Sequence, residues 1–166
     1  MVTLNNQNLR TSFDSDGYIS INPLFSIEKI EEIKIELTRY IKEVAPNVPD
    51  HHIFYENKDD KTSIKQLQQM FTYDDYFKEL IENSPIREVA EIVLREKAQP
   101  KNLQFFNKPP GIGKPTPPHQ DGYYFMLKKH NAVTCWLALE KVDEENGCIH
   151  YDVSYTHLTL PTKLAV

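Results

Sequence analysis

A segment rich in proline and glycine divides this chain into two parts with different patterns. Five prolines and two glycines lie between Lys108 and Pro118. Because proline fixes φ and lacks a backbone N–H, this stretch is compatible with neither a helix nor a central strand. It is therefore a long loop, and it leads directly into His119-Gln120-Asp121-Gly122. Loops of this kind often carry functional residues.

The part before the loop favours helices. Ser26 is a suitable N-cap for a helix that ends at Pro46 and Pro49. Its apolar residues recur at helical spacing: Ile27, Ile30, Ile33, Leu37, Ile41 and Val44. A second helix is predicted after Thr72, with Asp74 and Asp75 followed by Tyr76, Phe77, Leu80 and Ile81. A third opens at Ser84-Pro85 and places Ile86, Val89, Ala90, Val93 and Leu94 on one face.

The later part of the chain favours strands. The predicted strands are Leu103–Asn107, Tyr123–Lys128, Ala132–Glu140 and the stretch that begins at Cys148 and reaches Tyr151, with a turn at Asp143–Gly147. Helices followed by strands, rather than alternating with them, predict an α+β fold.

Composition narrows the classes of partner. The 166 residues include 19 basic and 24 acidic side chains, a net charge of −5, and no basic cluster. We therefore expect no nucleic-acid and no membrane partner. The N-terminus lacks the pattern of a secretory signal, so a cytoplasmic location is expected. The two cysteines, Cys135 and Cys148, are expected to be buried structural thiols.

His119 and Asp121 are the first candidates for chemistry. In an extended segment, residues i and i+2 point to the same face, so the imidazole and the carboxylate converge. Two histidines and one carboxylate on one face suit a ferrous ion that keeps open positions, and this pair supplies two of the three. A hydrogen-bonded surface pair without metal is the alternative.

The surrounding residues resemble the phytanoyl-CoA dioxygenase family of iron- and 2-oxoglutarate-dependent oxygenases. The similarity covers the stretch Asn107–Asp121, then Tyr123-Tyr124-Phe125, Cys135–Leu139 and the Glu145-Asn146-Gly147-Cys148 turn. Phe13–Ile19 is similar to the opening of the family's domain. The resemblance spans residues 13 to 151 and is most specific between 105 and 148.

The resemblance implies a double-stranded β-helix, that is, a cupin-like jelly roll, supported by N-terminal helices. It implies that His119 and Asp121 bind iron(II). It also places Lys108 at a lysine that reaches 2-oxoglutarate, and Trp136 at an aromatic position of the cosubstrate pocket. A solvated surface lysine and a core tryptophan are the alternatives for these two residues. The implied reaction consumes molecular oxygen and 2-oxoglutarate, hydroxylates a small organic substrate, and releases succinate and carbon dioxide.

The end of the chain departs from the family pattern. The family continues with further strands that carry a distal histidine and a 2-oxoglutarate-binding arginine. Here, Val153–Thr162 instead resembles a translated adapter from sequencing libraries. We therefore expect residues 1–152 to be the N-terminal part of an incomplete jelly roll and residues 153–166 to be a non-native tail. His157 lies in that tail, and none of His51, His52, His130 and His150 is expected to be the third iron ligand.

Two other functions are compatible with the same residues. One is a non-catalytic jelly-roll module that binds a ligand on the aromatic face of Tyr123, Tyr124 and Phe125. The other is hydrolysis assisted by zinc on His119 and Asp121, which would normally need three protein ligands. The sequence does not specify the substrate or the oligomeric state.

Overall fold

The computed structural model describes residues 6–121 and 131–152. Its helices are α1 (Asn6–Asp16), α2 (Ile27–Arg39), α3 (Met70–Tyr73), α4 (Asp75–Glu82) and α5 (Pro85–Leu94). Its strands are β1 (Ile53–Tyr55), β2 (Ile64–Leu67) and β3 (Phe105–Phe106). Short helical turns follow α2: η1 (Tyr40–Val44), η2 (Ala45–Asn47) and η3 (Asp50–His52). Helices beside a small antiparallel sheet make this an α+β fold, as the sequence predicts.

Side-chain caps explain where the three predicted helices begin. The Ser26 hydroxyl accepts a hydrogen bond from the backbone N–H of Lys29, so α2 begins at the expected cap. Ser84 caps α5 in the same way, with Pro85 in its first turn. Asp74 caps α4 by accepting from the N–H groups of Tyr76 and Phe77. All three helices predicted from apolar spacing are therefore confirmed.

The sheet has the order β1-β2-β3, and both pairs are antiparallel. Leu67 on the central strand lies opposite Ile53 on one side and Phe105 on the other. The pairing continues beyond β3, because the N–H of Asn107 donates to the carbonyl of Lys65 at 2.8 Å. The sheet therefore fixes the chain up to Lys108, where the proline-rich loop begins.

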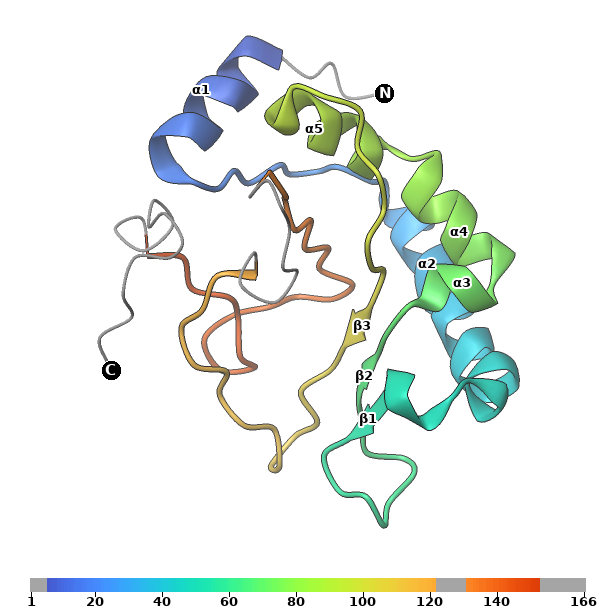
Figure 1. The fold of residues 1–166 in the computed structure, drawn as a ribbon. Helices are drawn as coiled ribbons and strands as arrows, with labels where there is room; N and C mark the ends of the chain where they lie inside the picture. Colours follow the sequence, from blue (N-terminus) through green and yellow to red (C-terminus); the bar gives the residue numbers. More distant parts are fainter. Residues whose placement is uncertain (1–5, 122–130, 153–166) are drawn as a thin grey trace.

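The core lies between the sheet and the helices α2, α3 and α4, which Figure 1 shows on one side of the strands. Its most buried side chains are Tyr40, Leu67 and Met70, and Tyr40 packs edge-on against Phe77 with the ring centroids 5.4 Å apart. Leu137 and Leu139, from the other side of the proline-rich loop, are half-buried against this core. The later part of the chain is thus docked on the helical part.

Several predictions for the later part are wrong. Within the described residues, neither Ala132–Glu140 nor Cys148–Tyr151 forms a strand, and the strand predicted around residue 105 is shortened to Phe105–Phe106. A strand needs a hydrogen-bonded neighbour, and these segments have no ladder in the described part of the chain. The predicted strand Tyr123–Lys128 lies outside the described residues, as do Tyr123, Tyr124 and Phe125 of the ligand-binding alternative.

Burial also corrects one expectation and excludes one alternative. Cys135 is exposed and Cys148 is half-buried, so the prediction of two buried thiols is wrong for Cys135. Trp136 is 49% exposed, which excludes a core role for this side chain.

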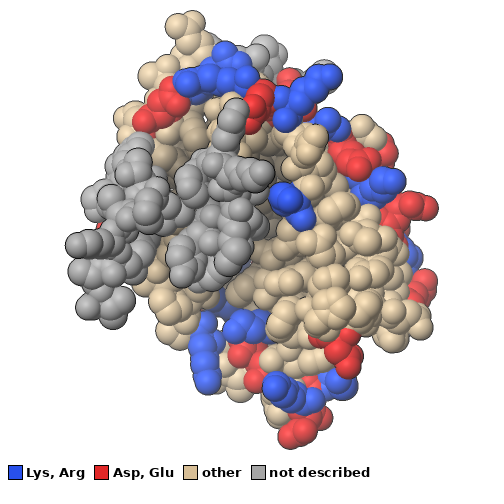
Figure 2. All heavy atoms as spheres, in the orientation of Figure 1, with Lys and Arg blue, Asp and Glu red and all other residues tan. Residues whose placement is uncertain are grey.

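Charges of both signs are interspersed over the face drawn in Figure 2. None of the helices in the described ranges has the length and apolar character needed to cross a membrane.

Candidate metal centre

The proline-rich loop brings His119 and Asp121 together, as predicted from their spacing. The distance between His119 Nε2 and Asp121 Oδ1 is 3.2 Å, and the two side chains are 38% and 41% exposed. Two ligand atoms that each lie about 2.1 Å from a metal, at a right angle, are about 3 Å apart. The separation and the donor types therefore fit two adjacent positions on one metal ion.

A backbone contact sets which nitrogen of His119 is available. Its Nδ1 lies 2.8 Å from the carbonyl oxygen of Pro117. A carbonyl oxygen only accepts hydrogen bonds, so Nδ1 carries a hydrogen. In the neutral ring, Nε2 is then the nitrogen with a lone pair, and it points at a carboxylate oxygen. A cation between the two atoms relieves this opposition, and metal-bound histidines commonly donate their other N–H to a carbonyl in this way.

Asp121 is held from its other side by Thr134. The Thr134 hydroxyl donates to Asp121 Oδ2, so the two carboxylate oxygens have different neighbours. Sequence analysis missed Thr134, although a lone hydroxyl in the apolar stretch that follows residue 131 was a usable signal.

Tyr151 lies near Asp121, and Tyr18 stacks on Tyr151. The rings of Tyr18 and Tyr151 stack with centroids 4.7 Å apart and planes 7° apart, which joins the N-terminal segment to the end of the described chain. Partial burial, and secondarily the negative charge of Asp121, raise the pKa of the half-exposed Tyr151 phenol. The pattern of the sequence did not single out either tyrosine as part of the site.

Lys108 is fixed at the entrance of the proline-rich loop by the Asn-Gly-Cys turn. Its Nζ donates to the carbonyl of Gly147 at 3.3 Å. Gly147 has φ +87°, and a Cβ atom there would lie 2.8 Å from Lys108 Cδ and 3.0 Å from Nζ. The turn therefore favours glycine for its backbone, and an added Cβ would displace the flexible end of the lysine side chain packed on it. An ammonium group has three donors, and this bond uses one of them.

Within residues 6–121 and 131–152, no third candidate ligand joins the pair. Among the described residues, no group of three or more His, Cys, Asp or Glu side chains could hold a metal ion. His52 Nδ1 lies 2.9 Å from the Tyr73 hydroxyl and His150 Nε2 lies 3.4 Å from Cys148 Sγ. His130 and His157 lie outside the described residues. The described residues thus bring together one histidine and one carboxylate of the kinds that bind metal.

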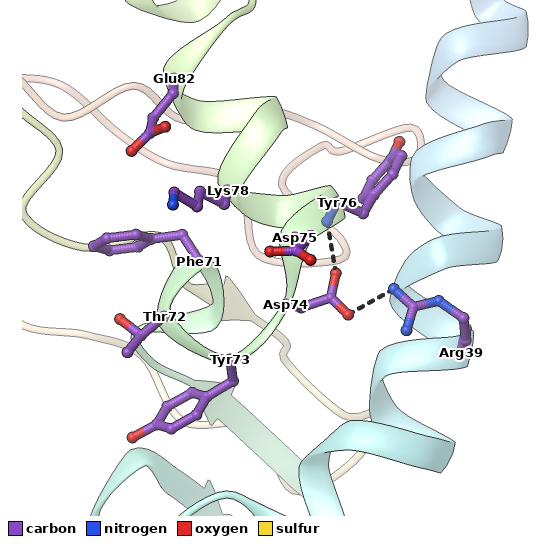
Figure 3. Close-up of a pocket in the computed structure, with 9 residues that line it drawn as sticks. All are labelled: Arg39, Phe71, Thr72, Tyr73, Asp74, Asp75, Tyr76, Lys78 and Glu82. Carbon is purple, nitrogen blue, oxygen red and sulfur yellow. Dashed lines mark hydrogen bonds and ion pairs between the residues drawn. The ribbon is translucent and has the colours of Figure 1, made fainter.

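A hollow of about 650 Å³ lies elsewhere, around α3 and α4 (Figure 3). At its edge, Asp74 Oδ2 accepts from Arg39 Nη2 at 2.7 Å while its other oxygen caps α4. None of the predicted site residues lines this hollow. The Asp74 carboxylate is already engaged by Arg39 and by the N-terminus of α4.

Comparison of the sequence with models of protein families identifies its family. The family model described as phytanoyl-CoA dioxygenase matches residues 13–162. The chain belongs to this family. The match includes residues 153–162, which belong to the predicted non-native tail. The non-native origin of residues 153–166 therefore stays a prediction.

Curated relatives agree with this assignment. The chain is 28% identical over 149 residues to the peroxisomal phytanoyl-CoA dioxygenase of Mus musculus, covering 84% of this chain and 44% of the relative. The protein of Bos taurus gives the same values. A phytanoyl-CoA dioxygenase domain-containing protein 1 homolog of Caenorhabditis briggsae is 22% identical over 181 residues, covering 86% of this chain and 62% of the relative. The chain thus spans less than half the length of the mammalian relatives, and no solved structure matches it significantly.

Proposed function

We propose that this chain is the N-terminal part of a non-haem iron(II) and 2-oxoglutarate-dependent dioxygenase that hydroxylates a small organic molecule. The observation that carries the proposal is the convergence of His119 Nε2 and Asp121 Oδ1 at 3.2 Å, with Nδ1 held by the Pro117 carbonyl. Family membership supports the same chemistry.

In the proposed enzyme, His119 and Asp121 hold the iron through Nε2 and Oδ1. When bound, the iron supplies oxygen activation coupled to oxidation of 2-oxoglutarate to succinate and carbon dioxide. The chain's own residues orient that chemistry: Pro117 fixes the imidazole tautomer, and the loop fixes the spacing of the two ligands. Lys108 and Trp136 are proposed to contact the cosubstrate, Lys108 through the donors that Gly147 does not use.

The remainder of the site is proposed to come from sequence beyond residue 152. A complete jelly roll there would add the third iron ligand and a 2-oxoglutarate-binding arginine. The coverage of the mammalian relatives, 44% of their length, supports a longer protein. The cytoplasmic location stays a prediction, and these relatives carry the word peroxisomal in their names.

The test is iron-dependent formation of succinate from 2-oxoglutarate by the protein extended to its natural C-terminus. Replacing His119 or Asp121 with alanine removes an iron ligand, so turnover should be lost in both variants. His51→Ala is the control, because His51 is an exposed histidine outside the pair, and it should keep wild-type turnover. Wild-type turnover in Asp121→Ala would refute the assigned ligands, and an iron-independent protein that binds a ligand would favour the non-catalytic module.

A further inference from the structure

The two carboxylate oxygens of Asp121 have different neighbours. Oδ1 faces His119 Nε2, whereas Oδ2 accepts the hydrogen bond from the Thr134 hydroxyl. A carboxylate can bind a metal through one oxygen or through both, and rotation about its last side-chain bond exchanges the two oxygens. A donor on Oδ2 opposes that rotation and leaves Oδ1 as the oxygen beside the imidazole.

The residue type at 134 suits this task. Threonine is branched at Cβ, which restricts χ1 and therefore the position of its hydroxyl. Thr134 follows Asp121 by 13 residues, so the bond joins the end of the proline-rich loop to the segment whose Leu137 and Leu139 pack on the core. Through this bond, the position of the Asp121 carboxylate depends on a segment that packs on the core, and not on the loop alone.

We propose that Thr134 is a positioning residue for Asp121, holding the carboxylate so that Oδ1 alone is presented to a divalent metal beside His119. This inference rests on the proposed function, because it concerns the same metal. It assigns a role to a residue outside the ligand set. Partners of this kind, hydrogen-bonded to a ligand, typically change metal affinity by 10- to 100-fold when they are removed.

The test compares three threonine variants and Asp121→Ala in the protein extended to its natural C-terminus. Thr134→Val removes the hydroxyl and keeps the shape, and Thr134→Ser keeps the hydroxyl and removes the methyl group. Thr38→Val is the matched control, because it removes a threonine hydroxyl that donates to the Lys34 carbonyl on α2, away from the site. Thr134 is exposed, so the substitutions should leave folding intact, which melting of the metal-free protein checks.

The measurement is the dissociation constant for Mn²⁺ alone, determined by the loss of its free-ion electron paramagnetic resonance signal. We expect Thr134→Val to weaken Mn²⁺ binding by about 10- to 100-fold, Thr134→Ser to retain most of the affinity, and Thr38→Val to match wild type. Equal affinity of Thr134→Val and wild type, while Asp121→Ala loses Mn²⁺, would overturn this inference and leave the proposed iron site standing. Wild-type Mn²⁺ affinity in Asp121→Ala would overturn both.

Discussion

Replacing Gly147 with alanine tests whether the Asn-Gly-Cys turn holds Lys108 in place. The added Cβ would lie 2.8 Å from Lys108 Cδ and 3.0 Å from Nζ, so the lysine side chain must move and its bond to the Gly147 carbonyl is lost. The chain offers a matched control in Gly111→Ala. Gly111 has φ +77°, close to the +87° of Gly147, but a Cβ there meets no atom within 4 Å.

The two variants share one cost and differ in another. Alanine in the left-handed region costs roughly 1–2 kcal/mol at either position. Only Gly147→Ala also loses the hydrogen bond, which contributes about 0.5–1.5 kcal/mol, with the lower end expected for an exposed bond. Because 1.4 kcal/mol is a factor of ten, the population with Lys108 displaced should rise about 2- to 10-fold in Gly147→Ala and stay unchanged in Gly111→Ala.

The assay is the rate of acetylation of the Lys108 amine, followed by mass spectrometry, with the other lysines as internal references. Gly147→Ala should raise the Lys108 rate, and Gly111→Ala should not. In a Lys108→Ala background, the two glycine substitutions should destabilise the protein equally, because the contact that distinguishes them is gone. Identical Lys108 rates in both glycine variants would refute the argument.

Three further expectations follow from the structure and the sequence. Burial, with smaller contributions from Asp74 and Tyr73, raises the pKa of Tyr40 to about 12 from its ordinary value near 10, so the folded state should lose stability between pH 10 and 12 as the unfolded chain releases the proton first. Tyr40→Phe should remove this alkaline dependence in denaturant melts, and an unchanged profile would contradict the assignment. The 166-residue chain by itself should aggregate or melt without cooperativity, because Val133, Leu137 and Leu139 are only half-covered. It should also show no 2-oxoglutarate decarboxylation. A monomer stabilised by ferrous iron plus 2-oxoglutarate would contradict both expectations. Sequencing of the genomic locus should show the reading frame departing at or just after Asp152 and encoding a further histidine and arginine, whereas a genomic frame that encodes Val153–Val166 and then stops would contradict it.

Local signals account for the parts of the fold that the sequence predicted. Ser26 and Ser84 are capping residues in front of apolar stripes, and both helices begin where these residues place them. The short strands β1 and β2 were missed because three or four residues are too few to show alternation, and their pairing depends on contacts such as Ile53 opposite Leu67. The strand predicted at Ala132–Glu140 is wrong for the converse reason: its apolar composition favours a strand, but pairing requires a neighbour.

The site shows the same division between local and distant information. The convergence of His119 and Asp121 was predictable because they are only two residues apart in the chain, and the structure brings their side chains to 3.2 Å. Thr134 and the stacked Tyr18 and Tyr151 were not, because each reaches the site from a distant part of the chain. Gly147 is an intermediate case: its turn was visible in the sequence, but its contact with Lys108 depends on tertiary structure.

The central claim is that His119 Nε2 and Asp121 Oδ1 bind one metal ion, and nuclear magnetic resonance of the histidine side chains tests it most directly. In the protein extended to its natural C-terminus, the His119 ring should carry its hydrogen on Nδ1 before metal is added, as the Pro117 contact requires. Titration with diamagnetic Zn²⁺ should then shift the Nε2 resonance of His119 while Nδ1 keeps its hydrogen, and Asp121→Ala should weaken the response. A titration that shifts only the rings of other histidines, such as His51 and His52, and leaves His119 unchanged would contradict the account.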